Sequence, residues 1–133
     1  MTTVNDKPMV SVIIPCFNGE KFVAQAIESV LNQSYQRFEI IVVDDSSSDN
    51  PVSIVKPYLT DTRIKVIKHE VNKGILVACN TGIRASTGEL IAFLDQDDLW
   101  LPEKLEKQVA VFLSGGKELG LVFTNLLIEK MES

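Results

Sequence analysis

Short apolar runs alternate with longer amphipathic segments along most of the chain, and this alternation restricts the fold more than any other feature. Strands are predicted at residues 10–14, 38–43, 64–67, 90–94 and 119–127. Helices are predicted at residues 20–33, 51–59 and 75–85, and from Pro102 onward. Such alternation is typical of a parallel sheet covered by helices. We therefore predict an α/β fold with an open, mostly parallel sheet and helices on both faces.

Two of the predicted strands end abruptly in carboxylates. The acidic residues are Asp44 and Asp45 after the second strand, and Asp95, Asp97 and Asp98 after the fourth. In open sheets of this kind, ligands bind outside the carboxyl ends of the strands. We therefore expect both acidic clusters to belong to one site.

Asp95 and Asp97 form an Asp-x-Asp pair directly after an apolar run. Side chains two positions apart in an extended segment face the same way, so both carboxylates could reach one ion. Mg²⁺ or Mn²⁺ suits such oxygens and takes one or two carboxylates, with substrate phosphates completing its shell. The pair by itself fits equally well with an acidic turn before the helix that begins at Pro102.

Three other segments have a functional interpretation and a structural one. Asp45 could accept hydrogen bonds from a base or ribose, although taken alone the Asp44–Asp45 pair favours an Asx-turn or helix cap. Phe17, after Pro15, could stack on a base, but the segment alone favours a turn with Phe17 in the core. The turn at residues 72–74 could approach a ligand by its backbone. The single histidine, His69, is predicted to be a solvated surface residue.

Length and charge restrict the remaining possibilities. A chain of 133 residues predicts one domain, here residues 9–127, between a polar tail at 1–8 and a C-terminal tail at 128–133. The net charge of -5 argues against binding to nucleic acid, which requires a basic face. A phosphorylated ligand would therefore need a local cation. No run reaches the ~18 apolar residues of a membrane span, which favours a cytoplasmic location.

Taken together, the order and spacing of these segments resemble the inverting family 2 glycosyltransferases, which have a GT-A fold. The resemblance extends from residue 9 to about residue 125, and the matching segments are 10–18, 29–34, 38–49, 72–74, 80–83, 85–89 and 93–102. It implies the nucleotide-sugar-binding part of such an enzyme, with a truncated fold. Asn50 followed by Pro51 also predicts a capped helix start within this region.

The resemblance assigns roles to six residues. It places Asp45 on the uracil of a UDP-sugar, Phe17 beside the base, and Asn72 near the nucleotide. Pro15 would shape the loop that carries Phe17. Asp95 would lie near the ribose and the metal, and Asp97 would be the principal ligand of Mg²⁺ or Mn²⁺.

The implied reaction is metal-dependent transfer of a sugar from a UDP-sugar to an acceptor hydroxyl, with inversion. The acceptor would be a glycan or lipid-linked saccharide of cell wall or polysaccharide biosynthesis, which also suggests peripheral attachment at the inner face of the membrane. Self-association through exposed apolar surface is a further expectation.

Two departures from the family pattern qualify this prediction. Cys79 stands where the family commonly has an arginine, and the chain ends before the segment that supplies the acceptor contacts and the general base. No catalytic base is therefore predicted here, and a non-catalytic nucleotide-sugar-binding fragment is the main alternative. A receiver-type phosphoacceptor domain is disfavoured because its acidic pair follows the first strand. A dinucleotide-binding oxidoreductase is disfavoured because no Gly-x-Gly-x-x-Gly follows that strand.

Overall fold

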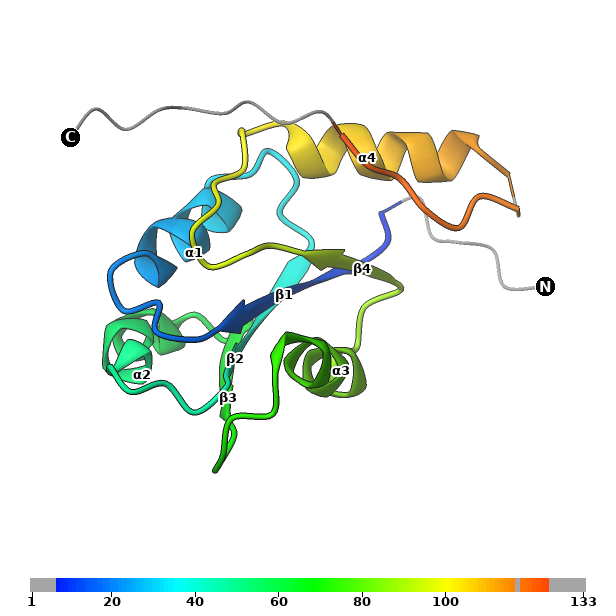
Figure 1. Ribbon diagram of the computed structural model, residues 1–133. Helices are drawn as coiled ribbons and strands as arrows, with labels where there is room; N and C mark the ends of the chain where they lie inside the picture. Colours follow the sequence, from blue (N-terminus) through cyan, green and yellow to red (C-terminus); the bar gives the residue numbers. More distant parts are fainter. Residues whose placement is uncertain (1–6, 117, 125–133) are drawn as a thin grey trace.

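The computed structural model describes residues 7–116 and 118–124. A four-stranded sheet runs through its centre (Figure 1), with strands β1 (Val10–Cys16), β2 (Phe38–Asp44), β3 (Ile64–Lys68) and β4 (Leu90–Phe93). All neighbouring strands are parallel, in the order β3-β2-β1-β4. The helices are α1 (Val23–Leu31), α2 (Pro51–Val55), η1 (Lys56–Thr60), α3 (Ile75–Ala85) and α4 (Lys104–Ser114). The predicted open parallel sheet is confirmed.

Alternate residues of the two central strands build the core on opposite faces of the sheet. Val12 and Ile14 of β1 pack in the larger cluster, together with residues of α1, α2 and α4. Ile41 and Val43 of β2 instead pack against Ala78 of α3. Helices thus cover both faces, as Figure 1 shows. This two-sided burial explains why both strands appear in the sequence as continuous apolar runs.

Helix α3 lies close to β1 because residue 82 is a glycine. A Cβ atom added at Gly82 would lie 2.5 Å from Cγ2 of Ile13, far inside van der Waals contact. The absence of a side chain therefore sets the distance between α3 and the sheet.

Several element boundaries differ from the predicted ones. Strand β1 continues to Cys16, because Pro15 pairs in register with Val43 and Cys16 pairs with Asp44. Helix α1 begins at Val23, three residues later than predicted, after a turn in which the Gly19 carbonyl accepts from the Val23 N–H. Helix α1 ends at Leu31, two residues earlier than predicted, and α4 begins at Lys104, two residues after the predicted start at Pro102. The helix predicted at residues 51–59 is divided into α2 and η1. The predicted helix start after Asn50 is confirmed, since its side chain accepts a hydrogen bond from the Ser53 N–H at 3.2 Å.

The predicted strand at residues 119–127 is wrong for the part that the structure describes. Residues 118–124 form no strand, and residues 125–127 lie outside the described residues. A run of strand-forming residues needs a neighbouring strand to accept its hydrogen bonds, and the sheet of the described residues ends at β4. Thr124 is instead held by Lys104 of α4, whose Nζ donates to its hydroxyl at 2.9 Å.

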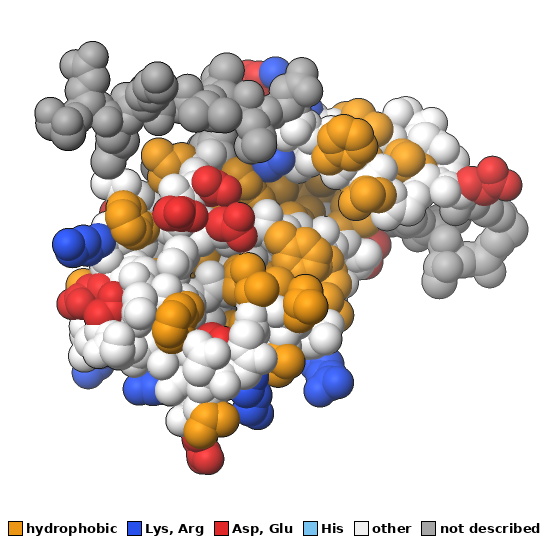
Figure 2. All heavy atoms as spheres, viewed as in Figure 1, with side chains coloured by type: hydrophobic (Ala, Val, Ile, Leu, Met, Phe, Trp, Pro, Cys, Tyr) orange, Lys and Arg blue, Asp and Glu red, His pale blue; other side chains and the backbone are white. Residues whose placement is uncertain are grey.

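The edge strand β4 leaves apolar side chains uncovered. Ile91 and Phe93 are 40% and 52% exposed. Figure 2 shows hydrophobic side chains gathered on the face that holds β4 and α3. In the described part of the chain, no helix is long and apolar enough to cross a membrane.

Candidate functional site

An open pocket of about 450 Å³ lies at the carboxyl ends of the strands. The six residues predicted to form the site all line it: Pro15, Phe17, Asp45, Asn72, Asp95 and Asp97. They come from segments that follow β1, β2, β3 and β4, or, for Pro15, from the end of β1 itself. The parallel sheet therefore brings together residues that are up to 82 positions apart, counted from Pro15 to Asp97.

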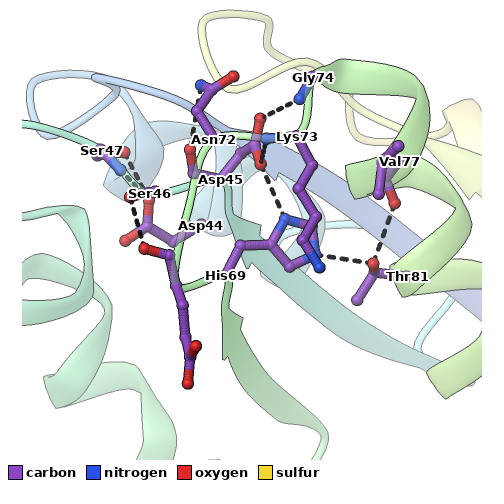
Figure 3. A network of polar contacts seen from close by, with 11 residues as sticks. Asp44, Asp45, Ser46, Ser47, His69, Asn72, Lys73, Gly74, Val77 and Thr81 are labelled. Atoms are coloured by element: carbon purple, nitrogen blue, oxygen red, sulfur yellow. Dashed lines mark hydrogen bonds and ion pairs between the residues drawn. The ribbon is translucent and has the colours of Figure 1, made fainter.

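Asp45 is the most constrained side chain of this pocket (Figure 3). Its Oδ1 accepts hydrogen bonds from the Lys73 N–H and from Nδ1 of His69, both at 2.8 Å, and its Oδ2 accepts from the Gly74 N–H at 2.8 Å. Burial alone would raise the pKa of this carboxyl, but the hydrogen bonds from His69, Lys73 and Gly74 outweigh it and hold the pKa below its ordinary value. Asp45 is therefore a buried anion at neutral pH.

The turn at residues 72–74 is shaped to meet this anion. Gly74, which directly precedes α3, has φ 91° and ψ 161°. Residues other than glycine rarely adopt this backbone conformation. The Lys73 and Gly74 N–H groups thus point at Asp45 from the positive end of the α3 dipole. Asn72 closes the turn by donating from Nδ2 to the backbone carbonyl of Asp45 at 3.2 Å.

The prediction that His69 is solvated is wrong. Its side chain is 7% exposed and lies between Asp45 and Thr81 of α3, with Nε2 at 2.8 Å from the Thr81 hydroxyl. The His69 N–H donates to the Asp44 carbonyl at 2.8 Å, which extends the β2–β3 pairing by one step. This pairing turns the imidazole toward Asp45, 24 positions earlier in the sequence.

Asp44 forms the predicted turn, whereas Asp45 faces the pocket. Asp44 Oδ1 accepts from the Ser47 N–H at 3.0 Å, an Asx-turn contact. The Ser47 hydroxyl in turn accepts from the Asn18 N–H at 3.0 Å. The loops that follow β1 and β2 are thereby joined beside the pocket.

Gln96, which sequence reasoning missed, connects the acidic loop to the loop after β1. Its Oε1 accepts from the Phe17 N–H and its Nε2 donates to the Phe17 carbonyl, each at 2.8 Å. Phe17 itself is 46% exposed and lines the pocket, so the alternative interpretation that placed its side chain in the core is wrong. No local signal marks Gln96, because its partner lies 79 positions away.

The acidic loop concentrates negative charge at the rim of the pocket. Asp95, Asp97 and Asp98 are all exposed, and the Asp98 N–H donates to the Asp95 carbonyl in a turn. Partial burial raises the pKa of Asp98, and the carboxylates of Asp95 and Asp97 raise it further. Partial burial, followed by the charge of Asp95, also raises the pKa of the Cys79 thiol, so Cys79 stands near this loop as a neutral group.

Asp95 and Asp97 have the donor chemistry that a divalent ion needs. Both line the pocket, and two carboxylates leave room for phosphate oxygens and water in an octahedral shell. Among the described residues, no group of three or more His, Cys, Asp or Glu side chains is arranged to hold a metal. The residues present therefore fit an ion that is shared with a bound phosphate.

Comparison with known proteins identifies the family. The family described as glycosyl transferase family 2 matches residues 11–124. This chain belongs to glycosyl transferase family 2. One curated relative is UDP-Glc:alpha-D-GlcNAc-diphosphoundecaprenol beta-1,3-glucosyltransferase WfgD of Escherichia coli. The two are 43% identical over 108 residues, and the match covers 81% of this chain and 42% of WfgD. The chain thus spans less than half the length of that relative.

Solved structures identify the fold. TarS of S. aureus in complex with UDP-GlcNAc superposes with a TM-score of 0.73 at 33% identity, covering 77% of this chain and 30% of TarS. The mannosyltransferase PcManGT of Pyrobaculum calidifontis, in complex with GDP-Man and Mn²⁺, superposes with a TM-score of 0.73 at 26% identity, covering 81% of this chain and 33% of that protein. The predicted GT-A fold is confirmed.

Proposed function

We propose that this chain forms the donor-binding part of a glycosyltransferase that uses a UDP-sugar and inverts the anomeric configuration. The observation that carries the proposal is the single pocket in which Phe17, Asp45, Asp95 and Asp97 meet at the carboxyl ends of the strands. That position is where open α/β sheets bind nucleotides. Membership of glycosyl transferase family 2 supplies the reaction class.

The names of relatives support a uridine nucleotide. WfgD is named for UDP-Glc, and TarS has been solved with UDP and with UDP-GlcNAc. PcManGT, which is less similar in sequence, was solved with GDP-Man. We therefore assign UDP-sugar as the donor.

Each residue then has a role that agrees with its surroundings. Asp45, a buried anion, would accept the ring N–H of uracil, and the exposed ring of Phe17 would stack beside the base. Asn72 would lie near the nucleotide, and Pro15 would shape the loop that carries Phe17.

Asp95 and Asp97 would hold Mg²⁺ or Mn²⁺, with Asp97 as the principal ligand and Asp95 also near the ribose. The ion would offset the charge that develops on the diphosphate leaving group. In the transfer itself, a deprotonated acceptor hydroxyl would attack the anomeric carbon from the face opposite UDP. We assign no general base within this chain.

The acceptor and the setting are part of the same proposal. WfgD is named for a diphosphoundecaprenol-linked saccharide, which supports a lipid-linked acceptor and polysaccharide biosynthesis at the cytoplasmic face of the membrane. Self-association through the exposed apolar side chains of β4 is proposed as well. A clean monomer in light scattering at high concentration would count against it.

Incubation with UDP-glucose or UDP-GlcNAc and Mn²⁺ tests the reaction class. Release of UDP above the background without protein, together with its loss in Asp97→Ala, would support an enzyme. Binding of UDP-sugar without release of UDP would favour the alternative of a non-catalytic nucleotide-sugar-binding part. Absence of both binding and release would contradict the proposal.

A further inference from the structure

The carboxylate of Asp45 is almost saturated with hydrogen bonds before any ligand arrives. A carboxylate offers about four acceptor positions. Three of them are filled, by the Lys73 N–H and His69 Nδ1 on Oδ1 and by the Gly74 N–H on Oδ2. One position remains, on Oδ2.

The imidazole of His69 carries a defined proton in this arrangement. Nδ1 lies 2.8 Å from an oxygen of an anion that can only accept, so Nδ1 must be the protonated nitrogen. Nε2 lies 2.8 Å from the Thr81 hydroxyl, which is also 3.0 Å from the Val77 carbonyl one helical turn earlier. Helix α3 therefore fixes the far side of the ring, as Figure 3 shows.

We propose that His69 is a positioning residue of the donor site, which fixes the Asp45 carboxylate so that a single acceptor position is offered to the base. The inference rests on the proposed function, since it concerns the base-binding end of the same pocket. A uracil ring presents one N–H, at N3, between two carbonyl groups. A cytosine ring has no proton at N3, and its lone pair would face the carboxylate.

The role of His69 goes beyond filling space in the core. Its only charged partner among the described residues is Asp45, and neither nitrogen is left to solvent. The Lys73 and Gly74 N–H groups hold one carboxylate oxygen each, so alone they would leave a second acceptor position open on both Oδ1 and Oδ2. His69 adds a donor after the end of β3 that fills the second position of Oδ1, which leaves one acceptor position, on Oδ2.

Two substitutions separate the two nitrogens of the ring. His69→Asn places an amide N–H close to the position of Nδ1, so it keeps the donor to Asp45 and loses Thr81. His69→Gln reaches the Thr81 side and removes the donor to Asp45. Thr81→Val is a matched control, because it removes the hydroxyl that contacts Nε2 and the Val77 carbonyl but leaves the donor to Asp45 in place.

Calorimetric titration of the full chain with UDP and with CDP, at saturating Mn²⁺, tests the inference. We expect wild type, His69→Asn and Thr81→Val to prefer UDP. His69→Gln should bind UDP about tenfold more weakly with CDP affinity unchanged, a loss equivalent to about 1.4 kcal/mol. Equal weakening of UDP and CDP by both His69 variants, or an unchanged preference in His69→Gln, would overturn the inference.

A second measurement needs no variant, so it tests the contact between His69 and Asp45 even if the substituted proteins do not fold. In ¹⁵N spectra of the wild-type imidazole, Nδ1 should be protonated in the free protein and its proton should exchange more slowly with UDP bound. An unprotonated Nδ1 would overturn the inference. If wild type binds neither nucleotide, the proposed function fails, whereas a wild-type preference for UDP that His69→Gln retains removes only the role of His69.

Discussion

Gln96 holds the backbone of Phe17 at both of its polar groups, accepting from the N–H and donating to the carbonyl at 2.8 Å each. The glutamine stands between Asp95 and Asp97 in the sequence, so its side chain ties the backbone that carries both carboxylates to the loop after β1. A Cβ atom at Gly19 would lie 2.2 Å from the Gln96 Oε1, which shows how closely the loops meet.

Substitution of Gln96 by alanine should loosen the acidic loop. Two hydrogen bonds of about 1 kcal/mol each would be lost, but water can bond to the freed Phe17 N–H and carbonyl in part. We therefore expect the free energy of unfolding to fall by about 1 kcal/mol. UDP affinity in the presence of Mn²⁺ should fall several-fold. Urea denaturation and calorimetry measure the two effects. Gln25→Ala, at an exposed glutamine of α1, is the control and should change neither; an equal loss there would contradict the assignment.

Gly74 and Gly82 should each resist substitution by alanine for different reasons. At Gly74 the space is open, but φ of 91° strains any L side chain, at a cost of about 1–3 kcal/mol. At Gly82 the new Cβ would lie 2.5 Å from Ile13, so α3 must shift. Thermal unfolding should show both variants destabilised, and only Gly74→Ala should also disturb the N–H groups on Asp45. A Gly74→Ala protein as stable as wild type would show that the turn does not need this conformation.

Glu39 ties the amino ends of the strands to the loop between α3 and β4. Its Oε1 accepts from the Ser11 hydroxyl at 2.7 Å and from the Thr87 N–H at 2.6 Å, and Lys65 Nζ lies 3.5 Å from Oε2. Burial raises the pKa of Glu39, but the hydrogen bonds from Ser11 and Thr87, with the charge of Lys65, bring it below its ordinary value of 4.5.

Glu39→Gln should therefore cost stability in a pH-dependent way. Because the folded pKa lies below the unfolded one, the contribution of the ionised group is present above 4.5 and is lost as the pH falls through the folded value. We expect the free energy of unfolding of Glu39→Gln to be about 1–2 kcal/mol below that of wild type at neutral pH. This difference should become smaller in acid. Urea denaturation of both proteins across this range measures it. A difference that stays constant with pH would contradict the role of the charge.

Much of the fold could be predicted because its strands are buried on both faces. Continuous apolar runs such as residues 10–14, alternating with helical segments, are typical of the central strands of a parallel sheet. The start of helix α1 was harder to predict, because Phe22 lies at helical spacing from Ala26 but belongs to the turn before Val23. The expected final strand failed because strand formation depends on a neighbour, which local sequence does not report.

Only those site residues that follow the predicted strands could be predicted from the sequence. Asp45, Asp95 and Asp97 directly follow apolar runs, so topology alone places them at one edge. His69 and Gln96 were missed because each acts on a partner far along the chain, through contacts that depend on strand register and loop conformation. A carboxylate after a strand is a visible pattern, whereas the side chain that orients it is not.

Thermal unfolding with UDP, with and without Mn²⁺, tests the donor site most directly. At a 100-fold excess over its dissociation constant, the ligand should stabilise wild type by about 2.7 kcal/mol, a shift of roughly 8 °C for a domain of this size. Asp97→Ala should abolish the metal-dependent part of the shift, while Asp98→Ala, at the adjacent residue that does not line the pocket, should retain it. No shift in wild type with UDP and Mn²⁺, or a full shift in Asp97→Ala, would contradict a metal-assisted UDP site at the ends of these strands.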